Sequence, residues 1–151
     1  NIHPGFVDNA HWNRIAALTL ALAEMKEFGE KYAKQVVRNA QVLAKALADS
    51  DFPVACLRLG FTRSHQVWLD YGEYKKGRAV AKRLEEANII ADCGVRLGVC
   101  ELTRRGMKQG EMLKVAELIA RALMGQEKLQ RIKKEVAEFA SDFQEVQFCF
   151  R

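Results

Sequence analysis

The spacing of apolar positions changes several times along the chain, and these changes predict its first elements. Residues 10–28 carry apolar side chains on nearly all sides, which predicts a helix buried against a large neighbour. Gly29 interrupts this pattern, and apolar residues then recur at three- and four-residue steps over 32–47, as in an amphipathic helix. The polar residues 49–51 and then Pro53 predict its end, because turn-forming side chains and a missing N–H donor stop a helix.

The centre and the end of the chain predict a small sheet followed by helices. Short apolar runs bounded by glycine and polar residues indicate strands, and periodic runs indicate helices. We expect strands at 54–59, 66–71, 89–91 and 95–99, and helices at 77–87, 109–124 and 127–143. The predicted fold class is α+β, a small antiparallel-type sheet with helices on one face, preceded by a long apolar connecting helix. We accordingly predict two parts, a connecting part over 1–28 and a small domain over 29–151.

Composition places the chain among globular proteins. Hydrophobic residues make up 49% and charged residues 28% of 151 residues, which excludes a disordered tail, a coiled-coil rod or a collagen-like fibre. The longest nearly unbroken apolar run, 15–23, is less than half of the ~20 residues that a membrane span needs. The chain begins with Asn1 and has no signal pattern, so we expect a piece of a longer protein.

Charge and cysteines narrow the class further. The formal net charge is +5, but acidic residues are interspersed even in the basic stretch 127–138, which is typical of a solvated helix face, and we do not expect nucleic-acid binding. The four cysteines form no CxxC pair and no spacing with histidine that suits a metal. Unpatterned thiols without a secretion signal favour the reducing cytoplasm.

Two groups of residues are candidates for chemistry. Ser64, His65 and Asp70 could be drawn as a triad, but neighbouring residues on a strand point to opposite faces, so we expect local hydrogen bonding instead. Arg96 lies in an apolar strand with a glycine two residues away on each side, and such a charge needs an anion or a water-filled cleft. Its planar fork of donors suits a bound carboxylate. The alternative is a buried structural ion pair with an aspartate, for example Asp92 or Asp70.

Four segments, taken together and in order, resemble serine hydroxymethyltransferases, which are fold-type I pyridoxal phosphate enzymes. The segment 94–107, GVRLGVCELTRRGM, is similar to the family's SGIRLG and TRxGM motifs near the C-terminus. Residues 3–6 and 15–17 are similar to the family's FPG turn and the IAA helix that follows it. Residues 32–40, YAKQVVRNA, are similar to its YaxQVVxNA helix. Residues 62–65 with 67–70 are similar to its T-x-x-H strand.

The resemblance implies a place in a larger enzyme. In the family, a large α/β domain carries pyridoxal phosphate and a small α+β domain follows it, and this chain matches the end of the first and the whole of the second. The resemblance implies that Arg96 binds the carboxylate of a serine- or glycine-type amino acid. It also implies an upstream large domain or separately encoded chain as partner, and a homodimer. The family's Schiff-base lysine lies in a TTTHK segment that this chain lacks, so we expect no catalytic residue and no covalently bound pyridoxal phosphate here.

Two departures from the family pattern bear on cofactors. The family's Gly-Gly-Pro, which approaches the cofactor phosphate across the dimer, is replaced by residues 8–10, where the carboxylate of Asp8 repels phosphate and Asn9 can donate a hydrogen bond. Only residues 91–93 stand where the family has a longer NKN…P loop on the folate side, so we do not expect folate use. The alternative function is a non-catalytic interaction or oligomerisation module, with the apolar first helix and 148–150 buried against a partner.

Overall fold

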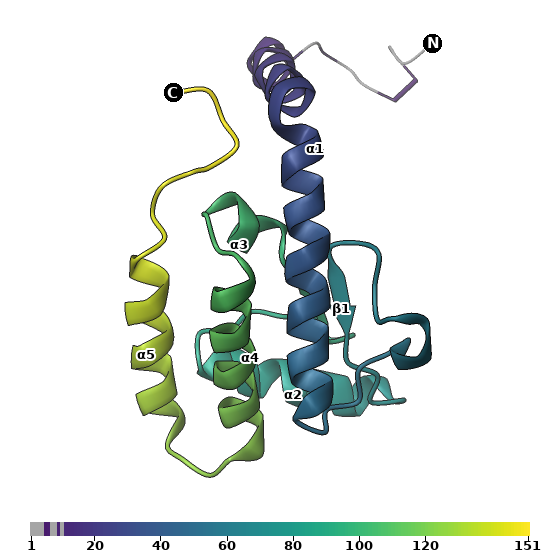
Figure 1. The fold of residues 1–151 in the computed structure, drawn as a ribbon, viewed down its shortest axis with the longest axis vertical. Helices are drawn as coiled ribbons and strands as arrows, with labels where there is room; N and C mark the ends of the chain where they lie inside the picture. Colours follow the sequence, from purple (N-terminus) through teal and green to yellow (C-terminus); the bar gives the residue numbers. More distant parts are fainter. Residues whose placement is uncertain (1–4, 7–8, 10) are drawn as a thin grey trace.

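Helices dominate the structure, and a two-stranded antiparallel sheet lies among them (Figure 1). The computed structural model describes residues 5–6, 9 and 11–151. Residues 3, 4, 8 and 10, which belong to motifs noted in the sequence, lie outside the described residues. The expected α+β class with an antiparallel sheet is confirmed. In chain order the elements are α1 (Trp12–Asp49), η1 (Leu57–Leu59), β1 (Gln66–Trp68), α2 (Tyr74–Glu86), β2 (Arg96–Gly98), α3 (Cys100–Arg104), α4 (Gln109–Met124) and α5 (Leu129–Ser141).

Helix α1 is a single helix of 38 residues, so the predicted break at Gly29 is wrong. A glycine inside a helix costs only about 1 kcal/mol relative to alanine, and the helix continues because its second half packs on the core. The first turns of α1, which precede the buried Glu24, stand away from the other elements (Figure 1). Their large apolar side chains are exposed, namely Trp12, Ile15, Leu18, Leu20 and Leu22. In the described residues, no helix is both long and apolar enough to cross a membrane.

The core lies where the second half of α1 meets the sheet and α4. Ala40, Leu43, Ala44 and Leu47 are at most 1% exposed, and their spacing of three and four residues places them on one face of the helix. They pack in one apolar cluster with residues of β1, β2, α2, α4 and α5. The amphipathic pattern over 32–47 therefore predicted the packed face correctly.

The sheet is smaller than the sequence suggests. In register, Gln66 pairs with Gly98 and Trp68 with Arg96, so two of the four expected strands are present. The expected strand 54–59 is reduced to an isolated antiparallel bridge between Val54 and Leu69. It goes no further because Cys56 adopts a left-handed backbone (φ 60°) and the chain curls into η1. The expected strand 89–91 is wrong. The N–H of Ile89 closes the end of α2 by bonding to the carbonyl of Leu84 at 2.9 Å.

The predicted helices are confirmed with adjusted ends, most closely 109–124, which coincides with α4. Helix α2 begins earlier than the predicted 77, and α5 is shorter at both ends than the predicted 127–143. Gly125 ends α4 in the left-handed conformation (φ 74°), the usual role of glycine after a helix. The short helix α3 was not predicted.

A buried polar network joins α1 to the segment that contains α3. Asn39 is fully buried, and its amide donates to the hydroxyl of Thr103 at 2.9 Å and to the carbonyl of Met107 at 2.9 Å. The Thr103 hydroxyl in turn donates to the carbonyl of Val99 at 2.7 Å, and the amide of Gln35 donates to Asn39 at 2.8 Å. Buried polar groups that are fully paired in this way fix one arrangement of the surrounding elements.

Replacing Asn39 with alanine should lower the free energy of unfolding by about 2–3 kcal/mol, because buried hydrogen bonds are lost and their partners stay buried. Urea denaturation followed by circular dichroism measures this change. Asn13→Ala is the matched control, since Asn13 lies on the same helix and is exposed. Equal stability of the two variants would show that the network does not hold α1 in place.

Helices α4 and α5 are joined by a cluster of charged side chains. Glu135 of α5 accepts from Lys114 at 2.6 Å and from Arg121 at 2.8 Å, and Arg121 also pairs with Glu127 at 2.5 Å. The hydrogen bond from Arg121, and then that from Lys114, lowers the pKa of Glu135 to about 2. Much of the basic charge near the C-terminus is therefore paired within the chain.

Glu135→Gln should destabilise the fold at neutral pH by about 1 kcal/mol or less, because the cluster is partly solvated. The pKa of Glu135 is lower in the folded state than its ordinary value of 4.5. The stabilisation is therefore present above that value and is lost as the pH falls toward 2. Urea denaturation at several pH values should show the difference between wild type and variant shrinking below pH ~4.5. Glu138→Gln, at an exposed position, is the control, and a difference independent of pH would contradict the assignment.

Candidate functional site

Arg96 lies at the start of β2 and forms an exposed ion pair with Asp92. The Arg96 Nε donates to Asp92 Oδ2 at 2.7 Å, Nη2 pairs with the same oxygen, and the backbone N–H of Arg96 donates to Oδ1 at 3.0 Å. The side chains of Arg96 and Asp92 are 56% and 39% exposed. Asp92 is therefore the ion-pair partner of Arg96, as one alternative predicted, but the pair is exposed and not buried. Asp70 instead accepts from the N–H of Gly72 at 2.9 Å.

The strand alternation explains why Arg96 faces outward. Burial along β2 follows the order exposed, buried, exposed, with Leu97 in the core. Arg96 and Gly98 therefore share the exposed face. An ion pair that is half exposed stabilises a fold by about 0–1 kcal/mol. Stability alone thus gives little reason for an arginine at this position, whereas an exposed guanidinium is suited to binding an anion.

The turn before Arg96 is held from two sides. Val95 is fully buried with a left-handed backbone (φ 51°), an unusual conformation for a β-branched residue, and its carbonyl accepts from the N–H of Leu69 at 3.1 Å. On the other side α2 comes very close, since a Cβ on Gly77 would lie 2.4 Å from the carbonyl oxygen of Cys93. The hydrogen bond from the Arg96 N–H, together with the guanidinium, lowers the pKa of Asp92, so the pair is ionised at neutral pH.

Other residues of the noted motifs hold the fold together. Gln35, Asn39 and Thr103 belong to the buried network described above. Arg104 pairs with the buried carboxylate of Glu24 at 2.5 Å, a contact that sequence reasoning missed. The sequence contains one signal for this contact, because the acidic Glu24 stands within the apolar pattern 10–28. A charge that is buried there requires a partner.

The Ser64, His65 and Asp70 arrangement is not a triad, as expected. The Ser64 hydroxyl accepts from the N–H of Gln66 at 3.3 Å and lies 3.2 Å from the hydroxyl of Thr62. Asp70 caps its own turn, as described above. Ser64 and Asp70 thus each bond to near neighbours in sequence, before and after β1, and not to each other.

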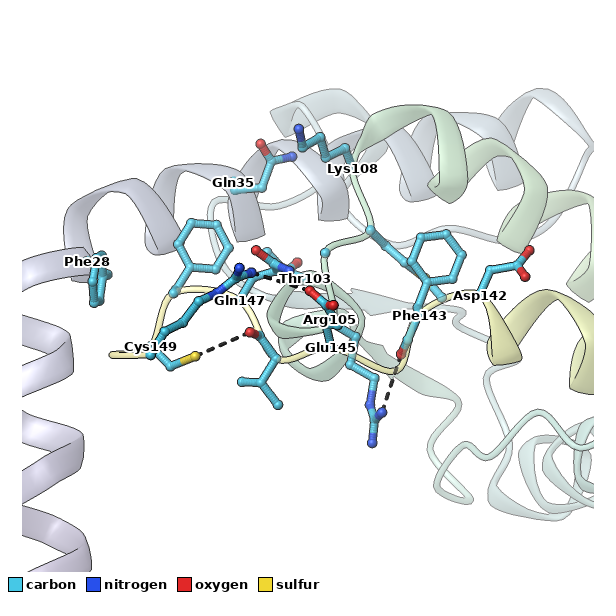
Figure 2. A pocket seen from close by; sticks show the side chains of 15 residues that line it. Phe28, Gln35, Thr103, Arg105, Lys108, Asp142, Phe143, Glu145, Gln147 and Cys149 are labelled. Atoms are coloured by element: carbon cyan, nitrogen blue, oxygen red, sulfur yellow. Dashed lines mark hydrogen bonds and ion pairs between the residues drawn. The ribbon is translucent and has the colours of Figure 1, made fainter.

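A cavity of about 740 Å³ lies between α1, the segment 103–108 and the C-terminal segment, and Arg96 does not line it (Figure 2). Its lining mixes charges of both signs with apolar rings, and Arg105 is already engaged by the carbonyl of Phe143 at 3.3 Å. Among the described residues, every buried polar side-chain atom has a hydrogen-bond partner. The cavity thus shows no group that awaits a ligand.

The aromatic residues near the C-terminus pack on α1 of the same chain. Phe148 lies against Tyr32 and Phe150 against Phe28, with ring centroids 5.4 and 5.5 Å apart. Glu24 also accepts from the N–H of Phe150 at 3.3 Å. The sequence suggested that 148–150 would be buried by a partner, whereas these contacts are internal.

Metal ligation finds no support in the described part of the chain. No group of three or more histidine, cysteine or acidic side chains could hold an ion there. All four cysteines are free.

One chain does not assemble a pyridoxal phosphate site from the residues that the structure describes. Asn9, the residue expected near the phosphate, is exposed just before α1. Arg96 pairs in the sheet with Trp68, and Trp68 lines a cavity together with Ala44 of α1. Ala44 is 32 residues beyond Trp12, the first residue of α1, which is roughly 48 Å along the helix. Asn9 and Arg96 therefore belong to opposite ends of α1, and the described residues of one chain do not fit the cofactor.

The fold defines a class, the C-terminal part of a fold-type I pyridoxal phosphate enzyme. The structure superposes on L-threonine transaldolase from Pseudomonas fluorescens with a TM-score of 0.93 and 29% identity, over 99% of this chain and 37% of that one. The family model for serine hydroxymethyltransferase matches residues 1–119. The chain belongs to the serine hydroxymethyltransferase family, which uses pyridoxal phosphate.

The relatives show how much of such an enzyme is represented. The chain is 42% identical to a serine hydroxymethyltransferase of Methanocella arvoryzae, over 99% of this chain and 39% of the relative. It is 43% identical to that of Sulfolobus acidocaldarius, over 99% and 38%. The chain thus spans less than two fifths of the curated relatives. The first alignment has 164 positions against 151 residues here, so at least 13 positions of the relative have no counterpart.

Gly77→Ala should destabilise the fold by about 1–3 kcal/mol, because the new methyl group would overlap the Cys93 carbonyl and push the turn away. Gly110→Ala is the matched control, since a Cβ there would meet nothing within 4 Å. A helical glycine replaced by alanine should stabilise by up to about 1 kcal/mol. Thermal and urea unfolding of both variants measure the two effects. A Gly77→Ala variant as stable as wild type would contradict the close approach of α2.

Proposed function

We propose that this chain is the C-terminal part of a pyridoxal phosphate-dependent enzyme that acts on serine- or glycine-type amino acids, with Arg96 as the ligand of the substrate's carboxylate. The observation that carries the proposal is an exposed, oriented guanidinium on a strand, in a chain of this family. Its position between two glycines leaves room for a close ligand. A guanidinium binds a carboxylate through two parallel hydrogen bonds, which fix orientation as well as affinity.

The role of this chain in such an enzyme is to bind and orient the substrate. Bond breaking at the amino acid is the chemistry of the cofactor, and the lysine that holds the cofactor belongs to the part of the enzyme that this sequence does not contain. A carboxylate fixed by Arg96 limits how the amino acid can rotate, and fixed orientation lowers the barrier of the later step. We place the enzyme in the reducing cytoplasm, with which four free cysteines are consistent.

The distance between Asn9 and Arg96 favours a homodimer. Because these residues lie at opposite ends of α1, they can serve one active site only if two copies of the chain contribute to it. In that arrangement Asn9 would be the residue that holds the cofactor phosphate beside the other copy.

The reaction we propose needs no folate. Residues 91–93 form a short turn directly before Arg96, and at least 13 positions of a serine hydroxymethyltransferase relative are missing from this chain. Between Ile90 and Gly94 the sequence has three residues in place of the longer loop expected on the folate side. This shorter turn is compatible with cleavage or formation of the Cα–Cβ bond of a β-hydroxy amino acid. The Pseudomonas fluorescens relative is named for threonine, which is such an amino acid.

The exposed apolar half of α1 favours a second candidate, a non-catalytic interaction or oligomerisation module. Trp12, Leu18 and Leu22 are each more than half exposed, and such patches mark association surfaces. Absorbance in the visible range, recorded after adding pyridoxal phosphate to this chain with and without its upstream part, separates the two candidates. A cofactor band with the upstream part supports the enzyme. Association without any cofactor band supports the module.

Arg96→Lys should raise the KM for the amino acid on the order of 10–100-fold in the enzyme assembled with its cofactor-bearing part. A lysine keeps the charge but loses the two-pronged hydrogen bond. Steady-state kinetics with serine or threonine measures the change. Arg131→Lys is the control, since Arg131 is exposed on α5 and distant in sequence from the turn. An unchanged KM in Arg96→Lys would refute the assignment of the carboxylate site.

A further inference from the structure

The carboxylate of Asp92 is fixed by the backbone of its own turn. Its Oδ1 accepts the N–H of Arg96 at 3.0 Å, while its main-chain carbonyl accepts the N–H of Val95 at 2.9 Å. Both bonds are made to main-chain groups, and the buried Val95 ties those groups to β1. The carboxylate is therefore held in place whether or not the guanidinium is engaged.

The second oxygen of Asp92 meets only one edge of the Arg96 guanidinium. Oδ2 accepts from Nε at 2.7 Å and also pairs with Nη2. A guanidinium has five N–H donors in a planar fork, so the end formed by Nη1 and the second hydrogen of Nη2 is left over. Within the described residues, no other hydrogen bond of the Arg96 side chain is formed. That end has the geometry that binds a carboxylate through two bonds.

Gly94 allows Asp92 and Arg96 to approach each other. A Cβ at this position would lie 3.3 Å from Asp92 Oδ1 and 3.6 Å from Arg96 Nε. The first distance is tighter than ordinary contact, so a larger residue would crowd the carboxylate. Glycine between the two charged residues is thus part of the same arrangement.

We propose that Asp92 is the positioning residue for substrate binding: it holds the Nε/Nη2 edge of Arg96 and so presents the adjoining Nη1/Nη2 edge to the carboxylate of the amino acid. The inference rests on the proposed function and assigns a residue that the motif does not contain. Asp92 stands in the short turn 91–93, so a chain with a longer loop here would need a different support for its arginine. An arginine pinned at one edge loses less rotamer entropy when it binds, and this preorganisation strengthens binding.

The competing possibility is that Asp92 occupies the place of the substrate and has to leave. The anchoring of Oδ1 by a main-chain N–H argues against it, because the carboxylate would have to give up a bond that is independent of Arg96. The two possibilities predict opposite changes in affinity when the carboxylate is removed.

The test uses Asp92→Ala and Asp92→Asn in the enzyme assembled with its cofactor-bearing part. We expect Asp92→Ala to raise the KM for serine about tenfold, with a smaller change in kcat, as for a loss of ground-state binding. Asp92→Asn keeps one acceptor and should have a smaller effect. The inhibition constant of ethanolamine, which is serine without its carboxylate, should be unchanged in both variants. Asp49→Ala, at an exposed position at the end of α1, is the control.

Each result decides the question. A lower KM in Asp92→Ala would show that Asp92 competes with the substrate, and an unchanged KM would show that it does not act on Arg96; either would overturn the inference. Weaker ethanolamine binding of equal size would indicate a general structural effect and would also overturn it. The Arg96→Lys variant distinguishes a failure of the proposed function from a failure of the role assigned to Asp92. If that variant raises the KM for serine while Asp92→Ala does not, the proposed function stands and the role of Asp92 is refuted.

Discussion

The arrangement of this chain depends on one buried side chain, the amide of Asn39. It is the fully buried point among the contacts that attach α1 to the segment leading from β2 through α3 into α4, and its partners Thr103 and Met107 lie in that segment. An apolar residue could fill the same space but would leave the Thr103 hydroxyl and the Met107 carbonyl without this partner, at a cost in free energy. The hydrogen bonds make one position of the helix better than its neighbours.

That constraint also bears on the candidate site. The segment 94–107 begins with the turn and strand that carry Arg96 and ends with residues bonded to Asn39, so one stretch contains both the candidate site and part of the packing. Strand alternation separates the two tasks, because Leu97 enters the core while Arg96 points outward. The similarity of this stretch to its family therefore reflects two separate physical requirements.

The sequence predicted helices better than strands, for reasons that particular residues make clear. Residues 109–124 combine a clear apolar face with Gly125 as a stop, and the predicted helix matched α4. The predicted break at Gly29 was wrong because the cost of one helical glycine is small beside the contacts that stabilise the rest of α1. The strand predicted over 54–59 ends early because Cys56 is left-handed, a conformation that the residue type does not indicate. Arg96 could be recognised from its apolar strand and flanking glycines, but the choice of Asp92 over Asp70 could not. It depends on a turn whose shape is set by Val95 and by the approach of Gly77.

The length of α1 has a mechanical consequence. A helix of 38 residues is roughly 57 Å long, and only its second half is embedded in the core. The exposed start of α1 lies far from the buried amide of Asn39. Trp12 stands 27 residues before Asn39, roughly 40 Å along the helix, so a tilt of about 5° at Asn39 would move that end by roughly 3–4 Å. A small rotation where α1 is packed would therefore displace the exposed apolar surface at its start much further than the buried residues.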